Sequence, residues 1–213
     1  MRLSGVPSVL AVAALLAALG PSLAGAAQAA AAARPRARPT APAIVVAPGT
    51  EAVVQTAKGS FTIRLLPESA PWHTALFVKT AKAGGYDGTT FHRIIAGGMI
   101  QGGDPLSKDP AKSALYGSGG LDILKAELSD RPFVRGTVAA VRKPSNLDSA
   151  GTQFFICLRD QPSLKGKYTI FGEVALGMDV VDQISLTPAD GEKARERVEM
   201  KVVVHEPQPA PAP

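Results

Sequence analysis

Cysteine is nearly absent from this 213-residue sequence, which contains one cysteine, one tryptophan and three histidines. The single cysteine, Cys157, has no second cysteine with which to form an intramolecular disulfide. It lies in the apolar run Gln153–Leu158, where a small buried thiol is expected, and a catalytic thiolate would need a neighbouring histidine. The composition therefore argues against a disulfide scaffold and against a cysteine nucleophile.

Acidic residues are absent from the N-terminal segment. None of the 18 Asp and Glu residues precedes residue 49, whereas four of the 23 Lys and Arg residues do, so the rest of the chain has a net charge of only +1. A strongly basic domain would indicate nucleic-acid binding, but here the excess positive charge lies outside the part that folds. We therefore expect no nucleic-acid partner.

Residues 1–29 are predicted to be a secretory signal peptide. Arg2 supplies a positive start, Val9–Leu19 is an apolar run, and Ala27–Ala29 fits a small-x-small cleavage site. An uncleaved N-terminal anchor is the alternative, although the apolar run is shorter than the roughly 20 residues of a membrane-spanning helix. The sequence thus predicts an exported, periplasmic protein with no stable membrane insertion after processing.

Two further segments have compositions that do not favour folding. Residues 30–48 are rich in Ala, Pro and Arg and are predicted to be a disordered linker, and residues 206–213 form a Pro-rich tail of the same kind. Residues 49–205 remain as one folded domain, a size that a single hydrophobic core normally serves.

Within this domain, short apolar and β-branched runs alternate with turn residues. Two helices are expected, one beginning with Ser69 as its N-cap and ending at Gly84–Gly85, and one over 178–186. Residues 107–121 are predicted to be a surface loop. Strand-like runs cover 52–56, 60–66, 91–105 with its glycine turn, 136–142, 152–158, 168–174 and 198–205. About eight strands and two helices predict a mainly β fold, a closed antiparallel barrel, with a β-sandwich as the alternative.

The stretch 91–105 (FHRIIAGGMIQGGDP) places Arg93 among residues typical of a buried strand. It is one of several sequence blocks: 86–93 (YDGTTFHR), 99–104 (MIQGGD), 135–139 (RGTVA), 149–156 (SAGTQFFI), 166–172 (GKYTIFG) and 177–181 (GMDVV). In this order the blocks resemble the cyclophilin-type peptidyl-prolyl cis–trans isomerases, in their compact bacterial exported form. The resemblance implies an eight-stranded barrel capped by two helices, with a groove for Xaa-Pro peptides on its outer face and no cofactor or metal.

The chemistry of such a site suits Arg93. Rotation about a peptide bond breaks the conjugation of the nitrogen with the carbonyl, at a barrier of ~18–20 kcal/mol. A donor aimed at the prolyl nitrogen stabilises the twisted state more than the planar ground state, and the guanidinium is always charged and rigidly planar. Gln101, which both donates and accepts, can hold the substrate backbone. Arg93 and Gln101 are thus the predicted catalytic residues, with a buried ion pair as the alternative role of Arg93.

The resemblance also implies the substrate-binding residues. Met99, Phe155 and Leu164 occupy the positions of the proline pocket, Val141 lines the adjoining part of the groove, and Tyr168 supplies a ring with a polar edge. Each of these side chains would otherwise be ordinary strand packing.

Two positions depart from the family pattern. Gly98 and Ala96 stand where the family usually has phenylalanine and proline. The missing ring at Gly98 predicts a gap in the pocket wall and a low rate.

The predicted function is acceleration of cis–trans isomerisation of Xaa-Pro bonds, assisting the folding of exported proteins. The expected partners are proline-containing peptides and unfolded polypeptides, bound by a monomer. The alternative is a non-catalytic Pro-peptide-binding or chaperone-like module on the same fold. A barrel that binds a small molecule is disfavoured, because it would not need the Arg-plus-Gln signature.

Overall fold

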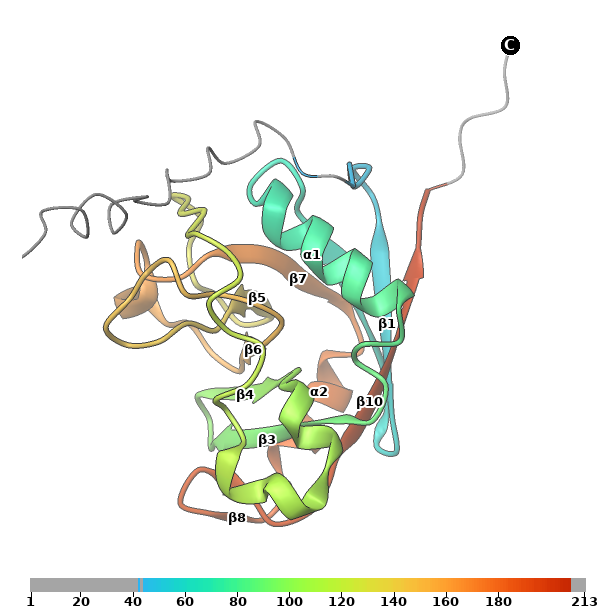
Figure 1. Cartoon of the computed structure of the whole chain (residues 1–213), viewed down its shortest axis with the longest axis vertical. Coiled ribbons are helices and arrows are strands. Elements are labelled where there is room, and N and C mark those ends of the chain that lie inside the picture. The colour runs from blue at the N-terminus through green and yellow to red at the C-terminus, as the bar shows by residue number, and fades with distance from the viewer. Residues whose placement is uncertain (1–41, 43, 208–213) are drawn as a thin grey trace, which may run out of the picture. The chain divides into compact units, whose positions relative to one another are not determined.

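The computed structural model describes residue 42 and residues 44–207 (Figure 1). The strands are β1 (Glu51–Thr56), β2 (Gly59–Leu65), β3 (Thr89–Ile95), β4 (Met99–Gly102), β5 (Thr137–Ala140), β6 (Phe154–Cys157), β7 (Ile170–Leu176), β8 (Ala189–Asp190), β9 (Lys193–Ala194) and β10 (Glu199–His205). The two α-helices are α1 (Pro71–Lys82) and α2 (Met178–Ser185).

Eight of these strands form a closed antiparallel barrel. Neighbouring strands follow the order β10-β1-β2-β7-β5-β6-β4-β3, and pairing of Glu199 and Met200 in β10 with Thr90 and Thr89 in β3 closes the ring. The closed barrel predicted from the sequence is therefore confirmed, and the sandwich alternative is wrong. The short β8–β9 hairpin lies outside the ring and joins it through β3.

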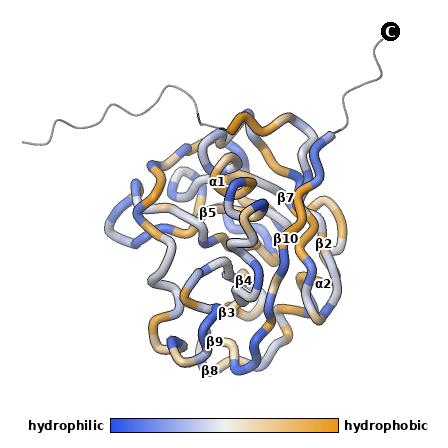
Figure 2. The backbone as a smooth tube through the Cα atoms, turned by 45° about the vertical axis from the view of Figure 1, so that its right-hand side comes forward, coloured by the Kyte–Doolittle hydropathy of each residue, from blue (hydrophilic) through white to orange (hydrophobic). Residues whose placement is uncertain are grey.

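The barrel interior is filled by the inward-facing residues of its strands. In β2 the buried residues Phe61, Ile63 and Leu65 alternate with more exposed ones, as the period-two pattern of the sequence predicts. Figure 2, which colours the chain by hydropathy, shows apolar and polar stretches following one another along the barrel. Phe77 of α1 lies 5.8 Å from Phe154 of β6 between ring centroids, so this helix contributes an aromatic side chain to the same core.

The N-terminus of α1 differs from the sequence-based prediction. Ala70, not Ser69, is the N-cap residue, and no side chain of the cap itself accepts a hydrogen bond. The carboxylate of Glu127 takes this role from a distant loop: it accepts from the backbone nitrogens of Trp72 at 3.1 Å and His73 at 3.0 Å. A local serine is thus replaced by a long-range acidic cap, which also complements the helix dipole.

The C-terminal end of α1 and the bounds of α2 agree with the prediction from the sequence. Gly84 has φ +66° and follows the end of α1, as predicted for a helix C-terminus. Helix α2 covers Met178–Ser185, close to the predicted 178–186, and its buried residues Val181 and Ile184 join the barrel core.

The segment predicted as a surface loop, 107–121, is exposed or half-buried apart from the buried Ser107, and two short 3-10 helices cover much of its first half. They cover Pro105–Lys108 and Pro110–Leu115. The buried carboxylate of Asp104 accepts from the backbone nitrogens of Leu106 at 2.8 Å, Gly117 at 2.5 Å and Gly119 at 3.2 Å, and so holds both ends of the segment. This fixed shape matters because the segment lines a cavity beside Arg93.

The predicted signal peptide, residues 1–29, lies outside the described residues, as do most of the linker and of the C-terminal tail. The described end of the linker already packs on the domain: Val46 is 8 % exposed and Ile44 contacts the core. In the part of the chain that the structure describes, no helix is long and apolar enough to cross a membrane.

Candidate active site

Arg93 and Gln101 lie directly opposite each other on the paired strands β3 and β4. The register of this pair shifts between Phe91 and Arg93, an irregularity of the kind that re-aims side chains near active sites. Nη1 of Arg93 donates to Oε1 of Gln101 at 3.1 Å. The two residues predicted to be catalytic are therefore in direct contact.

A chain of amides holds Gln101 in place. Its Nε2 donates to Oε1 of Gln153 at 2.9 Å, and Nε2 of Gln153 donates to the carbonyl of Gly119 at 2.7 Å. Gln101 is 5 % exposed and Gln153 is fully buried, so both amides have lost water as an alternative partner. In the sequence Gln153 lies within the block 149–156, and no local signal marks it as the support of Gln101.

The next strand places an aromatic ring beside this pair. Phe155 of β6 lies opposite Gln101, and Ala139 of β5 lies opposite Phe155, so a row of side chains crosses the sheet. Their neighbours along the strands, Ile100 and Ile156, belong to the barrel core. Because successive strand residues point to opposite faces, the row stands on the outer face of the barrel.

All five predicted substrate-binding residues belong to one hydrophobic cluster on this outer face. The cluster is separate from the barrel core and consists of Leu66, Phe133, Ala139, Phe155, Cys157 and Ile170, with Met99, Val141, Leu164 and Tyr168 packed against it. The structure thus brings together residues from β4, β6 and the segments that follow β5 and β6. Their identity as substrate contacts stays a prediction.

Aromatic contacts give this cluster its shape. The Phe155 and Tyr168 rings meet edge to face, with centroids 5.3 Å apart and an interplanar angle of 85°, and Phe133 stacks on Phe155 at 6.4 Å. The guanidinium of Arg142 lies over the Tyr168 ring, 4.7 Å from its centroid. Phe133 and Arg142 were missed in the sequence, where Phe133 has no periodic apolar neighbours to mark it as buried.

Gly98 does not leave the simple gap that the sequence suggested. A Cβ atom on Gly98 would lie 2.9 Å from Cγ2 of Ile95, so Ile95 occupies the direction that a side chain would take. The carbonyl of Gly98 accepts from the backbone nitrogen of Leu158 at 2.9 Å, which fixes this turn against the segment after β6. Ala96, the second departure from the family pattern, is exposed.

Cys157 is buried in the outer cluster, as predicted for an inert thiol. Burial, reinforced by the negative charge of Asp160, raises its pKa to about 12. The thiol therefore packs as a small apolar group beneath the aromatic rings.

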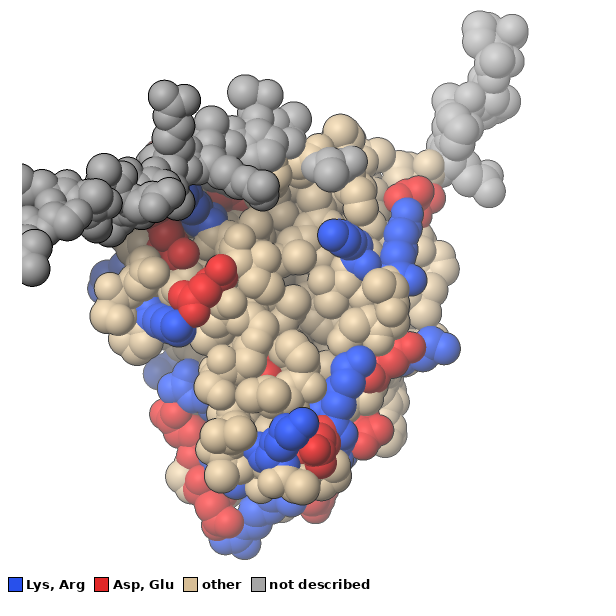
Figure 3. Space-filling model, viewed as in Figure 1, with Lys and Arg blue, Asp and Glu red and all other residues tan. Residues whose placement is uncertain are grey.

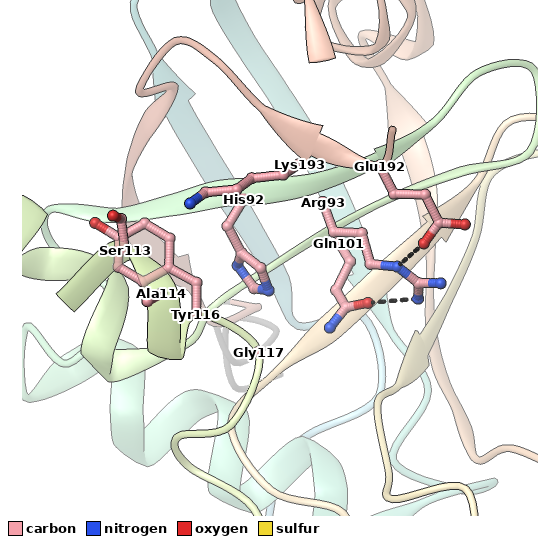
Figure 4. A pocket seen from close by; sticks show the side chains of 9 residues that line it. All are labelled: His92, Arg93, Gln101, Ser113, Ala114, Tyr116, Gly117, Glu192 and Lys193. Atoms are coloured by element: carbon pink, nitrogen blue, oxygen red, sulfur yellow. Dashed lines mark hydrogen bonds and ion pairs between the residues drawn. The ribbon is translucent and has the colours of Figure 1, made fainter. Parts of the chain in front are cut away.

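On the other side of Arg93 lies a cavity of about 270 Å³ (Figure 4). It is lined by His92, Arg93, Gln101, Ser113, Ala114, Tyr116, Gly117, Glu192 and Lys193. Burial is the main cause that lowers the pKa of His92, so this ring is neutral at physiological pH. Glu192 accepts from Nε of Arg93 at 2.6 Å, and the two side chains are 53 % and 43 % exposed. Arg93 is thus ion-paired, but the pair is half-exposed and not the buried one that the alternative required.

Residues 52–205 match the family described as "Cyclophilin type peptidyl-prolyl cis-trans isomerase/CLD". The fold is accordingly that of an enzyme that isomerises peptide bonds preceding proline. The chain belongs to the cyclophilin-type peptidyl-prolyl cis-trans isomerase family.

Similar proteins agree with this assignment. A probable peptidyl-prolyl cis-trans isomerase of Brucella suis is 42 % identical over 142 residues, which cover 64 % of this chain and 72 % of the relative. A peptidyl-prolyl cis-trans isomerase-like 1 protein of Neurospora crassa is 40 % identical over 156 residues, covering 72 % and 91 % of the two chains. The crystal structure of a cyclophilin-type isomerase of Cryptosporidium parvum has a TM-score of 0.66 and 26 % identity, and covers 75 % of this chain and 99 % of that one. The same protein was also solved in the presence of the dipeptide Ala-Pro.

Proposed function

We propose that this isomerase acts on proteins after their export and that Arg93 is its catalytic group. The substrate would be the Xaa-Pro bond of an extended or unfolded polypeptide. Its proline ring would pack on the outer cluster, between Met99, Phe155 and Leu164. Arg93, at the edge of this cluster, would then face the prolyl nitrogen.

The observation that supports this proposal is the placement of the Arg93–Gln101 pair. Through the register of β3, β4 and β6, the guanidinium stands in one row with the Phe155 ring. An apolar surface for a pyrrolidine ring is therefore adjacent to a fixed cation. A peptide whose proline rested on the rings would have its amide nitrogen on the side of the row where Arg93 stands.

The energetic requirement on this arrangement is modest. Nitrogen that has lost conjugation carries a lone pair that accepts a hydrogen bond, whereas the planar amide nitrogen does not. Lowering the barrier by about 5–6 kcal/mol corresponds to roughly 10⁴-fold acceleration. A charge-assisted hydrogen bond formed only in the twisted state is the kind of interaction that supplies such a difference. This step involves no proton transfer to the substrate.

The Arg93→Ala variant tests the catalytic role. In a protease-coupled isomerisation assay on an Ala-Pro peptide, we expect its rate to fall by at least about tenfold, while affinity for the peptide changes less. Arg64→Ala on β2 is the matched control, because Arg64 lies on a strand that contributes nothing to the outer cluster. Equal rates for Arg93→Ala and the wild type would leave the non-catalytic binding module as the better description.

The export proposal depends on the first 29 residues and has its own test. N-terminal sequencing of the protein recovered from the periplasmic fraction is expected to give a start at about residue 30. An intact N-terminus in the membrane fraction would instead indicate the uncleaved anchor. Elution of the mature protein at about 20 kDa in size-exclusion chromatography would support the proposed monomer.

A further inference from the structure

The guanidinium of Arg93 is held from two sides. Its Nε donates to Oε2 of Glu192 at 2.6 Å, and its Nη1 donates to Oε1 of Gln101 at 3.1 Å (Figure 4). These two bonds fix the plane of the guanidinium, because they use donors on two different nitrogens. Nη2 has no hydrogen-bond partner among the described residues, and the side chain is 43 % exposed.

The acidic partner comes from a rigid turn. Residues 189–194 form the β8–β9 hairpin, in which Ala189 pairs with Ala194 and Asp190 pairs with Lys193. Gly191 has φ +59° at the first central position of the two-residue connection, as a type II′ turn requires. Glu192 is the second central residue, so its backbone position is set by the turn.

Three contacts fasten this hairpin to β3 and to its own base. The backbone carbonyl of Glu192 accepts from the nitrogen of Ile94 at 2.7 Å, and Lys193 is the register partner of Arg93. Asp190 accepts from Nε of Arg195 at 2.8 Å. The charged side chains of this region appear as intermixed red and blue at the lower end of Figure 3, where Figure 1 shows β8.

We propose that Glu192 is a positioning residue that holds the Arg93 guanidinium in the orientation required for isomerisation. It does not contact the substrate. The Glu192 carboxylate restricts the rotamers of Arg93. Nη2 and the free face of the guanidinium therefore already point to the place of the prolyl nitrogen before the peptide binds. Prior orientation of a catalytic group acts mainly on the chemical step. The inference rests on the proposed catalytic role of Arg93.

A role in stability alone does not account for this pair. Both side chains are about half exposed, and exposed ion pairs contribute little to folding. The hairpin also retains its attachment to β3 without the carboxylate, because that attachment uses the backbone of Glu192. Removing the side chain is therefore expected to change the freedom of Arg93 and to leave the barrel intact.

The test compares Glu192→Ala, Glu192→Gln and Arg93→Ala with the wild type. The matched control is Glu196→Ala, which removes one exposed negative charge four residues away. Among the residues that the structure describes, Glu196 has no hydrogen bond or ion pair. Exchange NMR on an Ala-Pro peptide at several concentrations gives kcat and KM separately. The ¹⁵Nε–¹Hε signal of Arg93 reports directly on the hydrogen bond.

We expect Glu192→Ala to lower kcat about five- to tenfold with KM within about twofold, and to lose the protected Nε–H signal of Arg93. Glu192→Gln, whose amide oxygen still accepts from Nε, is expected to keep at least about half of kcat. Glu196→Ala is expected to match the wild type, and all variants to have the wild-type circular dichroism spectrum.

Three results would overturn the inference, and only the last of them would also overturn the proposed function. If Arg93→Ala is slow but Glu192→Ala keeps the wild-type kcat, Glu192 has no positioning role and the proposed function stands. The same holds if Glu192→Gln falls as far as Glu192→Ala, since charge and not the hydrogen bond would then matter. If Arg93→Ala itself is unimpaired, the proposed catalytic role fails together with the inference.

Discussion

Nδ1 of His73 lies 2.5 Å from Oε2 of Glu127, a carboxylate that also caps the first turn of helix α1. Residues 54 positions apart are joined by this contact. The backbone N–H of Glu127 in turn donates a hydrogen bond to Oγ1 of Thr169 at 2.8 Å. One acidic side chain thus connects the helix to the segment that leads to Phe133 of the outer cluster.

This contact predicts an acid-sensitive part of the stability. Burial alone would raise the pKa of Glu127, but hydrogen bonds from His73 and from the Trp72 backbone nitrogen outweigh it and hold the pKa below its usual value. A depressed carboxyl pKa contributes stability above the unfolded-state pKa, and this contribution is lost as pH falls through the folded-state pKa. Urea denaturation between about pH 7 and pH 3 is expected to show a smaller decline for Glu127→Gln than for the wild type.

At neutral pH the same substitution is expected to lower the free energy of unfolding by about 1–3 kcal/mol, because a buried acceptor of several hydrogen bonds is weakened. Glu68→Gln is the control, since Glu68 is exposed and has no hydrogen bond or ion pair among the described residues. Equal stabilities of Glu127→Gln and Glu68→Gln at pH 7 would contradict this assignment of the cap.

The amide chain from Gln101 to Gly119 predicts a loss of both stability and rate in Gln153→Ala. Removal of the Gln153 amide leaves the amide nitrogen of Gln101 buried without its partner, which is expected to lower the free energy of unfolding by about 1–3 kcal/mol. Gln101 would then have freedom to turn away from Arg93, so kcat/KM is expected to fall as well. Thermal denaturation and the isomerase assay measure the two effects, and an unchanged rate in a destabilised protein would show that Gln101 is held by other contacts.

The contact between Gly98 and Ile95 predicts the outcome of restoring a ring to the pocket wall. Gly98→Phe alone is expected to lower the free energy of unfolding by about 1–3 kcal/mol, because its Cβ meets Ile95 at 2.9 Å. The double variant Gly98→Phe with Ile95→Ala makes room for the ring and is expected to recover part of this loss. Denaturant titrations give the free energy of unfolding of Gly98→Phe, of Ile95→Ala and of the double variant. If the losses of the two single variants simply add up in the double variant, the contact between residues 95 and 98 is contradicted.

The thiol of Cys157 is predicted to be inert in the folded protein. With a pKa raised to about 12, only on the order of 10⁻⁴ of it is thiolate at pH 8. Labelling by an aromatic disulfide reagent at pH 8 should therefore be slow in the native state and fast in concentrated urea. Comparable rates in the two states would mean that the outer cluster opens easily.

Much of this architecture was accessible from the sequence, and the reason is local periodicity. Alternation at Phe61, Ile63 and Leu65 gives a strand with one buried face, and Gly84 ends a helix through its own backbone preference. Arg93 and Gln101 stood out because polar side chains interrupt apolar strands. Their direct contact follows from the tight glycine turn between β3 and β4.

What escaped prediction depends on residues distant in sequence. Nothing near Glu127 marks it as the cap of a helix 55 positions earlier, and the partner of Arg93, Glu192, lies 99 positions away. The hairpin that carries Glu192 had a readable signal, Asp190-Gly191, but its two-residue strands are too short for a periodic pattern. Phe133 belongs to the outer cluster because it stacks on Phe155, a residue of strand β6 that lies well beyond it in the sequence.

Closure of the barrel also decides how an extended client can be held. Each of the eight ring strands has hydrogen-bonded neighbours on both sides over at least part of its length, so the ring offers an unfolded chain little free edge to which it could add as a further strand. A polypeptide substrate must therefore be bound through its side chains and individual peptide groups, at a single proline in each binding event. A closed sheet of this kind presents little template on which an aggregating chain could extend the sheet.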